Sequence, residues 1–216
     1  MRIGILGGTF NPIHNAHLRI AEEVRDRLDL ERVMFVPAAS PPHKLLAGEL
    51  SFEVRYEMVR LAIADNPFFT ISDIEGKRGG TSYSIHTLQE LHLAYPADEF
   101  FFIIGSDSFL DIGSWKEYAA IFNLCNIVVV SRPGAVADPL DKALPVAIAD
   151  RFCYHAAEKR LTHSSGHSVY SIAGTLLDIS SSEIRTLTRQ GRSIRYLLPA
   201  TVEQYIKEQR IYNDGR

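Results

Sequence analysis

The fold is decided at the beginning of the chain, where residues 2–28 read RIGILGGTFNPIHNAHLRIAEEVRDRL. The apolar run at residues 2–6 ends in Gly7 and Gly8, which is the pattern of a buried strand that enters a tight turn. Beyond the turn, apolar residues recur on one helical face, namely Leu18, Ala21, Val24 and Leu28. The segment therefore predicts a strand, a loop and a helix.

Strands and helices are expected to alternate along the rest of the chain. The same patterns predict strands at 33–36, 69–74, 100–104 and 126–130, and helices at 52–64, at 84–93 and from about Ser181 and Pro199. A Pro and Gly turn is expected at 132–134 and a mixed segment at 147–179. This alternation predicts an α/β, Rossmann-like, doubly wound fold whose parallel sheet is covered on both faces, with a small C-terminal helical part at 180–216.

Size and composition indicate one enzyme-sized domain spanning residues 1–216. The chain is 46% hydrophobic, which is enough for one good core. Its net charge of -3 argues against a general nucleic-acid binder. There is no basic leader, and no apolar run approaches the roughly 20 residues that span a bilayer, so we expect a cytoplasmic protein without a membrane segment. Cys125 and Cys153 are expected to be reduced core thiols, and a homo-oligomer is left open.

One polar stretch, LTHSSGHS at residues 161–168, is predicted to be a loop because it is rich in Ser and contains Gly. His163 and His167 lie in it, and His155 lies shortly before it. Their spacing does not match zinc-ligand patterns, so solvated loop histidines are favoured over metal ligands. No protein metal site is predicted.

The segment GGTFNPIHNAH at residues 7–17, here called the first loop, is predicted to bind phosphate. It follows a strand and opens a helix, so backbone N–H groups and the positive end of the helix dipole can face an anion. It contains neither G-x-G-x-x-G nor the Gly-Lys-Ser/Thr of a Walker loop. Instead, His14 and His17 stand three residues apart, so both rings can lie on one face. The alternative for each histidine alone is a helix cap or a surface residue.

Ordered motifs along nearly the whole chain resemble the H-x-G-H nucleotidyltransferase superfamily and, within it, the bacterial nicotinate-nucleotide adenylyltransferases. They are the first loop, PPHK at 41–44, TSYSIHTL at 81–88, FFIIGSDSFLDIGSWKEY at 101–118, ISSSEIR at 179–185 and YLLPATVEQYI at 196–206. Two places depart from the family's pattern. Ala16 replaces the motif glycine, which adds a methyl group where a nucleotide approaches, and Ser84 and His86 replace Thr and Asp.

The resemblance implies a reaction in which the 5′-phosphate of nicotinate mononucleotide attacks the α-phosphorus of ATP and pyrophosphate leaves. Positioning and cationic or hydrogen-bonding groups would supply most of the acceleration. His14, His17, Lys44 and Arg185 are the expected catalytic residues, with His17 on the α-phosphate and His14 on the β or bridging oxygens. Mg²⁺ would be held mainly by ATP phosphates and water.

The resemblance also implies a set of substrate-binding residues: Gly7, Gly8, Thr9, Phe10, Asn11, Ser84, Gly105, Asp107, Trp115, Lys116 and Ser181. Read without it, several positions have ordinary structural alternatives. Arg185 could belong to a plain helix capped by Ser180–Ser182, and Lys44 to a stiff surface loop. Asp107 could be the N-cap of the next helix, and Trp115 a core residue.

Two other function classes remain open at this stage. A related transferase could use another phosphate acceptor, such as phosphopantetheine or glycerol phosphate, because the histidine pair and the serine-rich helix suit any nucleotidyl transfer. A noncatalytic nucleotide sensor could keep the fold without turnover. The residues at 105–115 and 196–199 favour the nicotinate branch by resemblance, and the intact His14, His17, Lys44 and Arg185 argue against a sensor.

Overall fold

The computed structural model describes residues 1–41, 50–131, 140–175 and 177–213. Its strands are β1 (Arg2–Gly8), β2 (Arg32–Pro37), β3 (Phe69–Ile71), β4 (Glu99–Gly105), β5 (Asn126–Ser131), β6 (Phe152–His155), β7 (Arg160–His163) and β8 (Ser168–Ala173). Its α-helices are α1 (Asn15–Arg27), α2 (Phe52–Ala62), α3 (Ile74–Arg78), α4 (Ser84–Ala94), α5 (Ser106–Leu110), α6 (Tyr118–Ile121), α7 (Ser181–Arg189) and α8 (Ala200–Glu208). Short 3-10 turns lie at Ile112–Ser114, Leu140–Ala143 and Val146–Arg151.

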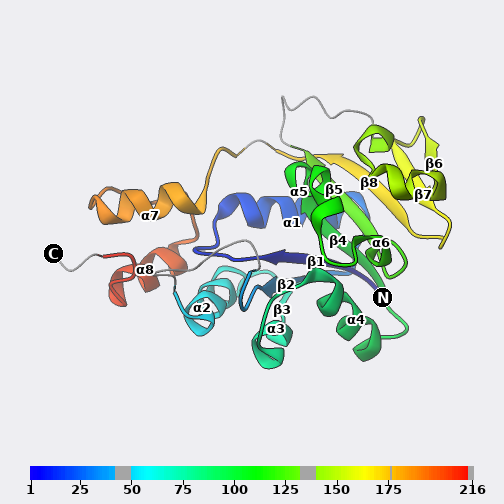
Figure 1. The fold of residues 1–216 in the computed structure, drawn as a ribbon. Helices are drawn as coiled ribbons and strands as arrows, with labels where there is room; N and C mark the ends of the chain where they lie inside the picture. Colours follow the sequence, from blue (N-terminus) through cyan, green and yellow to red (C-terminus); the bar gives the residue numbers. More distant parts are fainter. Residues whose placement is uncertain (42–49, 132–139, 176, 214–216) are drawn as a thin grey trace.

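All eight strands form one sheet in the order β3-β2-β1-β4-β5-β8-β7-β6 (Figure 1). The six strands from β3 to β8 in that order pair in parallel, which confirms the predicted parallel α/β sheet. The chain moves from β1 outward to β2 and β3 and then returns to β4 on the other side of β1. The carboxyl ends of β1 and β4 therefore meet at the point where the strand order reverses, which is where sheets of this kind bind ligands.

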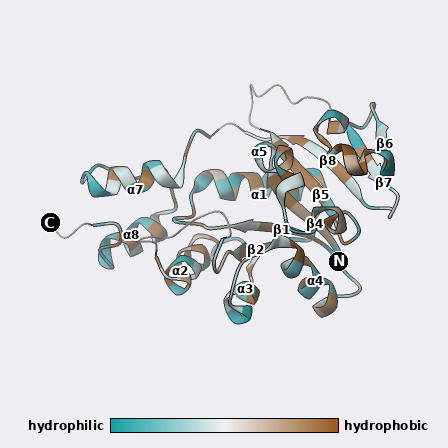
Figure 2. Ribbon diagram, viewed as in Figure 1, coloured by the Kyte–Doolittle hydropathy of each residue, from teal (hydrophilic) through white to brown (hydrophobic). Residues whose placement is uncertain are grey.

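The alternating residues of the strands separate the core into two layers, one on each face of the sheet. Leu6, Phe101 and Val128 face α1, α2, α7 and α8, whereas Ile5 and Phe102 face α4, α5 and α6. Figure 2 shows hydrophobic residues in the central strands and mixed colours in the surrounding helices. The sequence prediction of helices on both faces is confirmed.

The structure differs from the sequence prediction at both edges of the sheet. The strand expected at 69–74 ends at Ile71, and the unpredicted helix α3 begins at Ile74. At the other edge, β6 and β7 pair antiparallel and extend the sheet beyond β8. The stretch 161–168 was predicted to be a loop, but its first three residues belong to β7 and Ser168 opens β8. The loop prediction was therefore wrong, because this polar segment forms a β-hairpin that is stabilised by hydrogen bonds between its two strands.

Two expectations about single side chains were wrong, each for its own reason. His163 is buried rather than solvated, because its ring packs 4.7 Å from the ring of Phe152 and its Nδ1 lies 2.9 Å from the hydroxyl of Ser165. Burial lowers the pKa of His163 below its usual value. Cys125 is a buried free thiol as expected, whereas Cys153 is free but exposed, because β6 is the edge strand of the sheet.

The C-terminal helices pack on the same core layer as α1 and α2, and Figure 1 shows them together at one end of the molecule. Ile184 of α7 and Val202 and Ile206 of α8 are buried there. The hydroxyl of Thr201 donates to the carbonyl of Leu61 in α2, at 3.0 Å. Among the described residues, no helix is long and apolar enough to cross a membrane. The predicted turn at 132–134 lies outside the described residues.

Candidate active site

A cleft of about 450 Å³ opens at the carboxyl ends of β1 and β4. Nine of the predicted site residues line it: Gly7, Gly8, His14, His17, Ser84, Gly105, Asp107, Trp115 and Ser181. A second hollow of about 420 Å³ shares Ser84, Asp107 and Trp115 and adds Lys116. Each hollow has the volume of a small-molecule pocket, since such pockets measure about 300–1,000 Å³, and the two adjoin through their shared residues.

His14 and His17 stack at the start of α1, with their ring centroids 3.7 Å apart. His14 is the N-cap residue, and its backbone N–H donates to Nδ1 of His17 at 3.2 Å. Because Nδ1 accepts this bond, a neutral His17 carries its proton on Nε2. Burial, and next the neighbouring His14, lower the pKa of His17 well below 6.5. His17 is therefore a neutral hydrogen-bond donor at neutral pH.

The lowered pKa of His17 makes protein stability depend on pH. Below pH 6.5 the unfolded chain protonates this histidine while the folded protein does not, so stability is lost as pH falls from 6.5 toward the folded pKa. We expect the melting temperature to fall less between pH 6.5 and 5 in His17→Gln than in the wild type. Thermal unfolding across this pH range measures the difference, and parallel curves would contradict the lowered pKa.

Phe10 explains why position 8 is a glycine. A Cβ at Gly8 would lie 3.0 Å from carbons of the Phe10 ring, and that ring in turn contacts the ring of His17 edge-on, with centroids 5.1 Å apart. Phe10 itself adopts a left-handed backbone conformation, with φ 48°. Phe10 is buried and does not line the cleft, so its place is behind the histidines.

Three further predicted site residues, Thr9, Asn11 and Arg185, do not line the cleft but take part in the hydrogen bonds that hold the first loop. The carbonyl of Thr9 accepts from Arg55 at 2.8 Å. The carbonyl of Asn11 accepts from Arg185 at 2.8 Å, and the hydroxyl of Ser181 donates to the carbonyl of Pro12 at 2.8 Å. Arg185 and Ser181 thus connect the start of α7 to the loop that carries the histidines.

The N-terminus of α7 is built as the sequence predicts. The hydroxyl of Ser180, the N-cap, accepts from the N–H of Glu183 at 3.1 Å. Ser180 and Ser181 both line the cleft, so the positive end of this helix dipole lies beside it. At α1, by contrast, the N–H of Asn15 donates to the carbonyl of Leu197 at 3.0 Å. The first N–H of α1 therefore donates to a protein carbonyl and not into the cleft.

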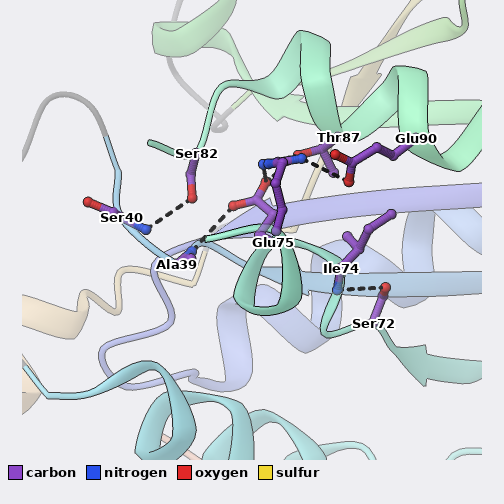
Figure 3. Close-up of polar contacts among 9 residues, drawn as sticks. Ala39, Ser40, Ser72, Ile74, Glu75, Ser82, Thr87 and Glu90 are labelled. Atoms are coloured by element: carbon purple, nitrogen blue, oxygen red, sulfur yellow. Dashed lines mark hydrogen bonds and ion pairs between the residues drawn. The ribbon is translucent and has the colours of Figure 1, made fainter. Parts of the chain in front are cut away.

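Glu75, which sequence reasoning did not single out, connects three segments of the cleft wall (Figure 3). This buried carboxylate lines the cleft and accepts from the hydroxyl of Thr87 at 2.5 Å and from the N–H of Ala39 at 3.3 Å. Ser40 and Ser82 exchange two further hydrogen bonds, of 3.0 and 2.9 Å. Ala39 and Ser40 are therefore held against α3 and the residues just before α4. Lys44 itself lies outside the described residues.

Arg55 is the other residue that sequence reasoning missed. It is 1% exposed and donates to the carbonyls of Thr9 at 2.8 Å, Ala39 at 3.2 Å and Leu50 at 3.3 Å. One side chain thus joins the first loop to the segment after β2. A signal existed, because residues 55, 58, 59 and 62 form the buried stripe of α2, and an arginine on an apolar stripe needs internal partners.

The residues at the ends of β4 and α5 form the opposite wall. Asp107 lies exposed in the first turn of α5, whose N-cap is Gly105, so the alternative that Asp107 is the N-cap was wrong. Trp115 is half-buried and contacts the ring of Phe102, with centroids 6.2 Å apart. Lys116 lies over the ring of Tyr83, 4.7 Å from its centroid. Ala16, which replaces the motif glycine, lines the cleft near the histidines.

Comparison with known proteins identifies the family of the chain. The cytidylyltransferase-like family model matches residues 5–187. A probable nicotinate-nucleotide adenylyltransferase of Geotalea uraniireducens is 81% identical, and one of Geobacter sulfurreducens is 66% identical, each over 100% of both chains. The Plasmodium falciparum nicotinic acid mononucleotide adenylyltransferase complexed with NaAD shares the fold, with a TM-score of 0.72 at 19% identity over 98% of this chain and 97% of that one. The chain therefore belongs to the cytidylyltransferase-like family and, within it, to the nicotinate-nucleotide adenylyltransferases.

Proposed function

We propose that this protein transfers the adenylyl group of ATP to nicotinate mononucleotide in NAD biosynthesis. A phosphate oxygen of the mononucleotide attacks the α-phosphorus, the bond from that phosphorus to the bridging oxygen breaks, and pyrophosphate leaves with the electron pair. The observation that carries the proposal is the stacked pair His14 and His17 at the cleft of a chain 81% identical to a relative with this name.

The chemistry follows from charge that builds on nonbridging oxygens during the displacement. A neutral His17 with its proton on Nε2 can donate to an oxygen of the α-phosphate without first losing a hydration shell. His14 is placed beside it for the β or bridging oxygens. The start of α7, with Ser180 and Ser181, supplies the second anion site, for the rest of the triphosphate.

The other substrate would lie between α4 and α5. Ser84, Asp107 and Trp115 line both hollows, so a ligand that passes from one to the other must contact them. The indole of Trp115 offers a flat surface to a pyridine ring, and Asp107 can accept from ribose hydroxyls. Lys44 and Arg185 complete the proposed catalytic set, with Arg185 acting from beside the cleft through its hydrogen bond to the carbonyl of Asn11.

Mg²⁺ is proposed to arrive with the ATP phosphates. Among the residues that the structure describes, no three His, Cys, Asp or Glu side chains lie together as metal ligands. Mg²⁺ generally keeps several waters and binds substrate phosphate oxygens, so it can enter the cleft with ATP. The ion would neutralise phosphate charge, and the protein groups named above would orient the phosphates.

The proposal is tested by incubating the protein with MgATP or MgCTP and one acceptor at a time. The acceptors are nicotinate mononucleotide, nicotinamide mononucleotide, phosphopantetheine and glycerol 3-phosphate. Released pyrophosphate gives the rate and mass spectrometry identifies the product. Nicotinate adenine dinucleotide should form fastest. Equal rates with the two mononucleotides would exclude a preference for nicotinate over nicotinamide. A faster reaction of another nucleotide with another acceptor would identify those two compounds as the substrates instead.

Glu75→Ala is expected to raise the KM for the mononucleotide about tenfold, because loss of hydrogen bonds to a charged group costs about 1.5–3 kcal/mol. The KM for ATP should change much less, because Glu75 holds Ala39 and Thr87, on the α4 side of the cleft. Glu75→Gln should retain most of the affinity. Steady-state kinetics with Glu57→Gln on α2 as the control measure this, and an equal rise in both KM values would contradict it.

A further inference from the structure

Five described hydrogen bonds connect the first loop to the C-terminal part of the chain. Besides the bonds from Ser181 and Arg185, the loop residue Asn15 uses both of its donors there. Its backbone N–H bonds the carbonyl of Leu197 at 3.0 Å, and its side-chain amide bonds the carbonyl of Tyr196 at 2.8 Å. Segments 181–197 therefore enclose the loop, although they lie at the other end of the sequence.

The last of these contacts is made by Tyr212. Its hydroxyl donates to Oδ1 of Asn11 at 2.6 Å, across a sequence separation of 201 residues. Asn11 is 5% exposed, so its side-chain oxygen has little access to water. A buried carbonyl that loses its partner keeps the cost of its desolvation, which makes this bond significant for the conformation of the loop.

Tyr212 is presented from a fixed turn. The N–H of the preceding residue, Ile211, donates to the carbonyl of Ile206 at 2.9 Å, and both isoleucines are buried in the core layer under α1. The turn therefore ends α8 in a defined position. Thr201 holds the beginning of the same helix to α2. The tyrosine hydroxyl is thus connected to the sheet through packed helices.

Asn11 is connected to His17 through Phe10. The preceding residue, Phe10, has a φ of 48°. Residues with a side chain rarely adopt this backbone conformation, so it persists only when the surrounding structure holds it. The Phe10 ring contacts His17 edge-on. Fixing Asn11 therefore fixes Phe10, and Phe10 limits the rotation of the His17 ring. His17 must point Nε2 at the phosphate, so its orientation affects the transition state more than substrate binding.

We propose that Tyr212 is a positioning residue for His17, acting through its hydrogen bond to Asn11 and the packing of Phe10. Only the kinetic test of this proposal rests on the proposed adenylyl-transfer function. It also gives the C-terminal turn after α8 a direct part in arranging the site. The bond couples the end of the chain to the catalytic end of β1.

Tyr212→Phe removes the hydroxyl and keeps the ring. We expect kcat to fall about three- to tenfold, as loss of one hydrogen bond predicts, while the KM values for both substrates stay within about twofold. Tyr205→Phe is the matched control, because Tyr205 lies on α8, packs against the same core layer and has no described hydrogen bond to the first loop. Its kcat should equal that of the wild type.

Hydrogen exchange provides a readout that does not depend on the reaction. Peptides covering residues 9–17 should exchange faster in Tyr212→Phe than in the wild type or Tyr205→Phe, while peptides of β4 stay unchanged. Faster exchange with a normal kcat, or a lower kcat with unchanged exchange, would overturn the proposed connection. An inactive wild type with altered exchange in the variant would reject the proposed function and leave the loop contact supported. The double variant with Asn11→Ala should show no further loss in kcat beyond Asn11→Ala alone.

Discussion

His17→Ala is expected to lower kcat by about a hundredfold or more, the usual effect of removing one donor from a developing negative charge. The physical reason is that His17 is a neutral Nε2 donor fixed by the backbone of His14 and by the ring of Phe10. KM for either substrate should change by less than about tenfold, since the start of α7 and the α4 side of the cleft are untouched. Pyrophosphate release under saturating substrates measures the loss.

His92→Ala is the matched control for this prediction. His92 is exposed on α4 and does not line the cleft, so its removal should leave turnover unchanged. A His17→Ala variant that turned over within threefold of the wild type would remove His17 from the mechanism. A fall in kcat with unfolding at the assay temperature is recognised by its circular dichroism, and His17→Gln then serves as the milder test.

Arg55→Met is expected to destabilise the protein by about 3 kcal/mol or more, because each buried acceptor left without a donor costs about 1–3 kcal/mol. Three carbonyls, those of Thr9, Ala39 and Leu50, lose the described bonds. For a chain of this size the melting temperature should fall by about 6–12 °C. Methionine keeps much of the volume, so the change reports on the lost hydrogen bonds more than on a cavity.

Arg60→Met is the control on the same helix. Arg60 pairs with Glu57 at the surface, where its side chain is 53% exposed, so the variant should melt close to the wild type. Equal melting temperatures of Arg55→Met and the wild type would show that the three carbonyls find other partners. A selective loss of kcat at normal stability would instead show that Arg55 acts mainly on the first loop.

Features that depend on neighbours in sequence could be predicted without coordinates. The start of α1 beside His14 and the serine cap of α7 each arise within a few residues, so their patterns are visible in the chain. The turn expected at Gly7 and Gly8 was placed too early, because β1 continues through both glycines and pairs there with β2. Most parallel strands were also found, because both faces are covered and the runs are almost continuously apolar. The cleft between β1 and β4 follows from that topology.

The edges of the sheet and the polar interior could not be predicted in this way. The β6–β7 hairpin is short and polar, and pairing with β8 decides its structure. Glu75 lies on a helix of five residues that carries no periodic signal. Arg55 could be noticed in the sequence because it lies on the apolar stripe of α2. Its three carbonyl partners could not be predicted, because they lie in loops that meet only after folding.

By itself, the sequence determined the alternation of strands and helices, and it predicted a phosphate-binding first loop together with the residues that would bring chemistry to it. These are local consequences of hydrophobic period, glycine turns and helix caps. Only the tertiary structure decided how those residues are held: Thr9 by Arg55, and Asn11 by Arg185 and Tyr212. The reason is that such hydrogen bonds join segments as much as 201 residues apart, and no local pattern encodes which distant donor a buried carbonyl will meet.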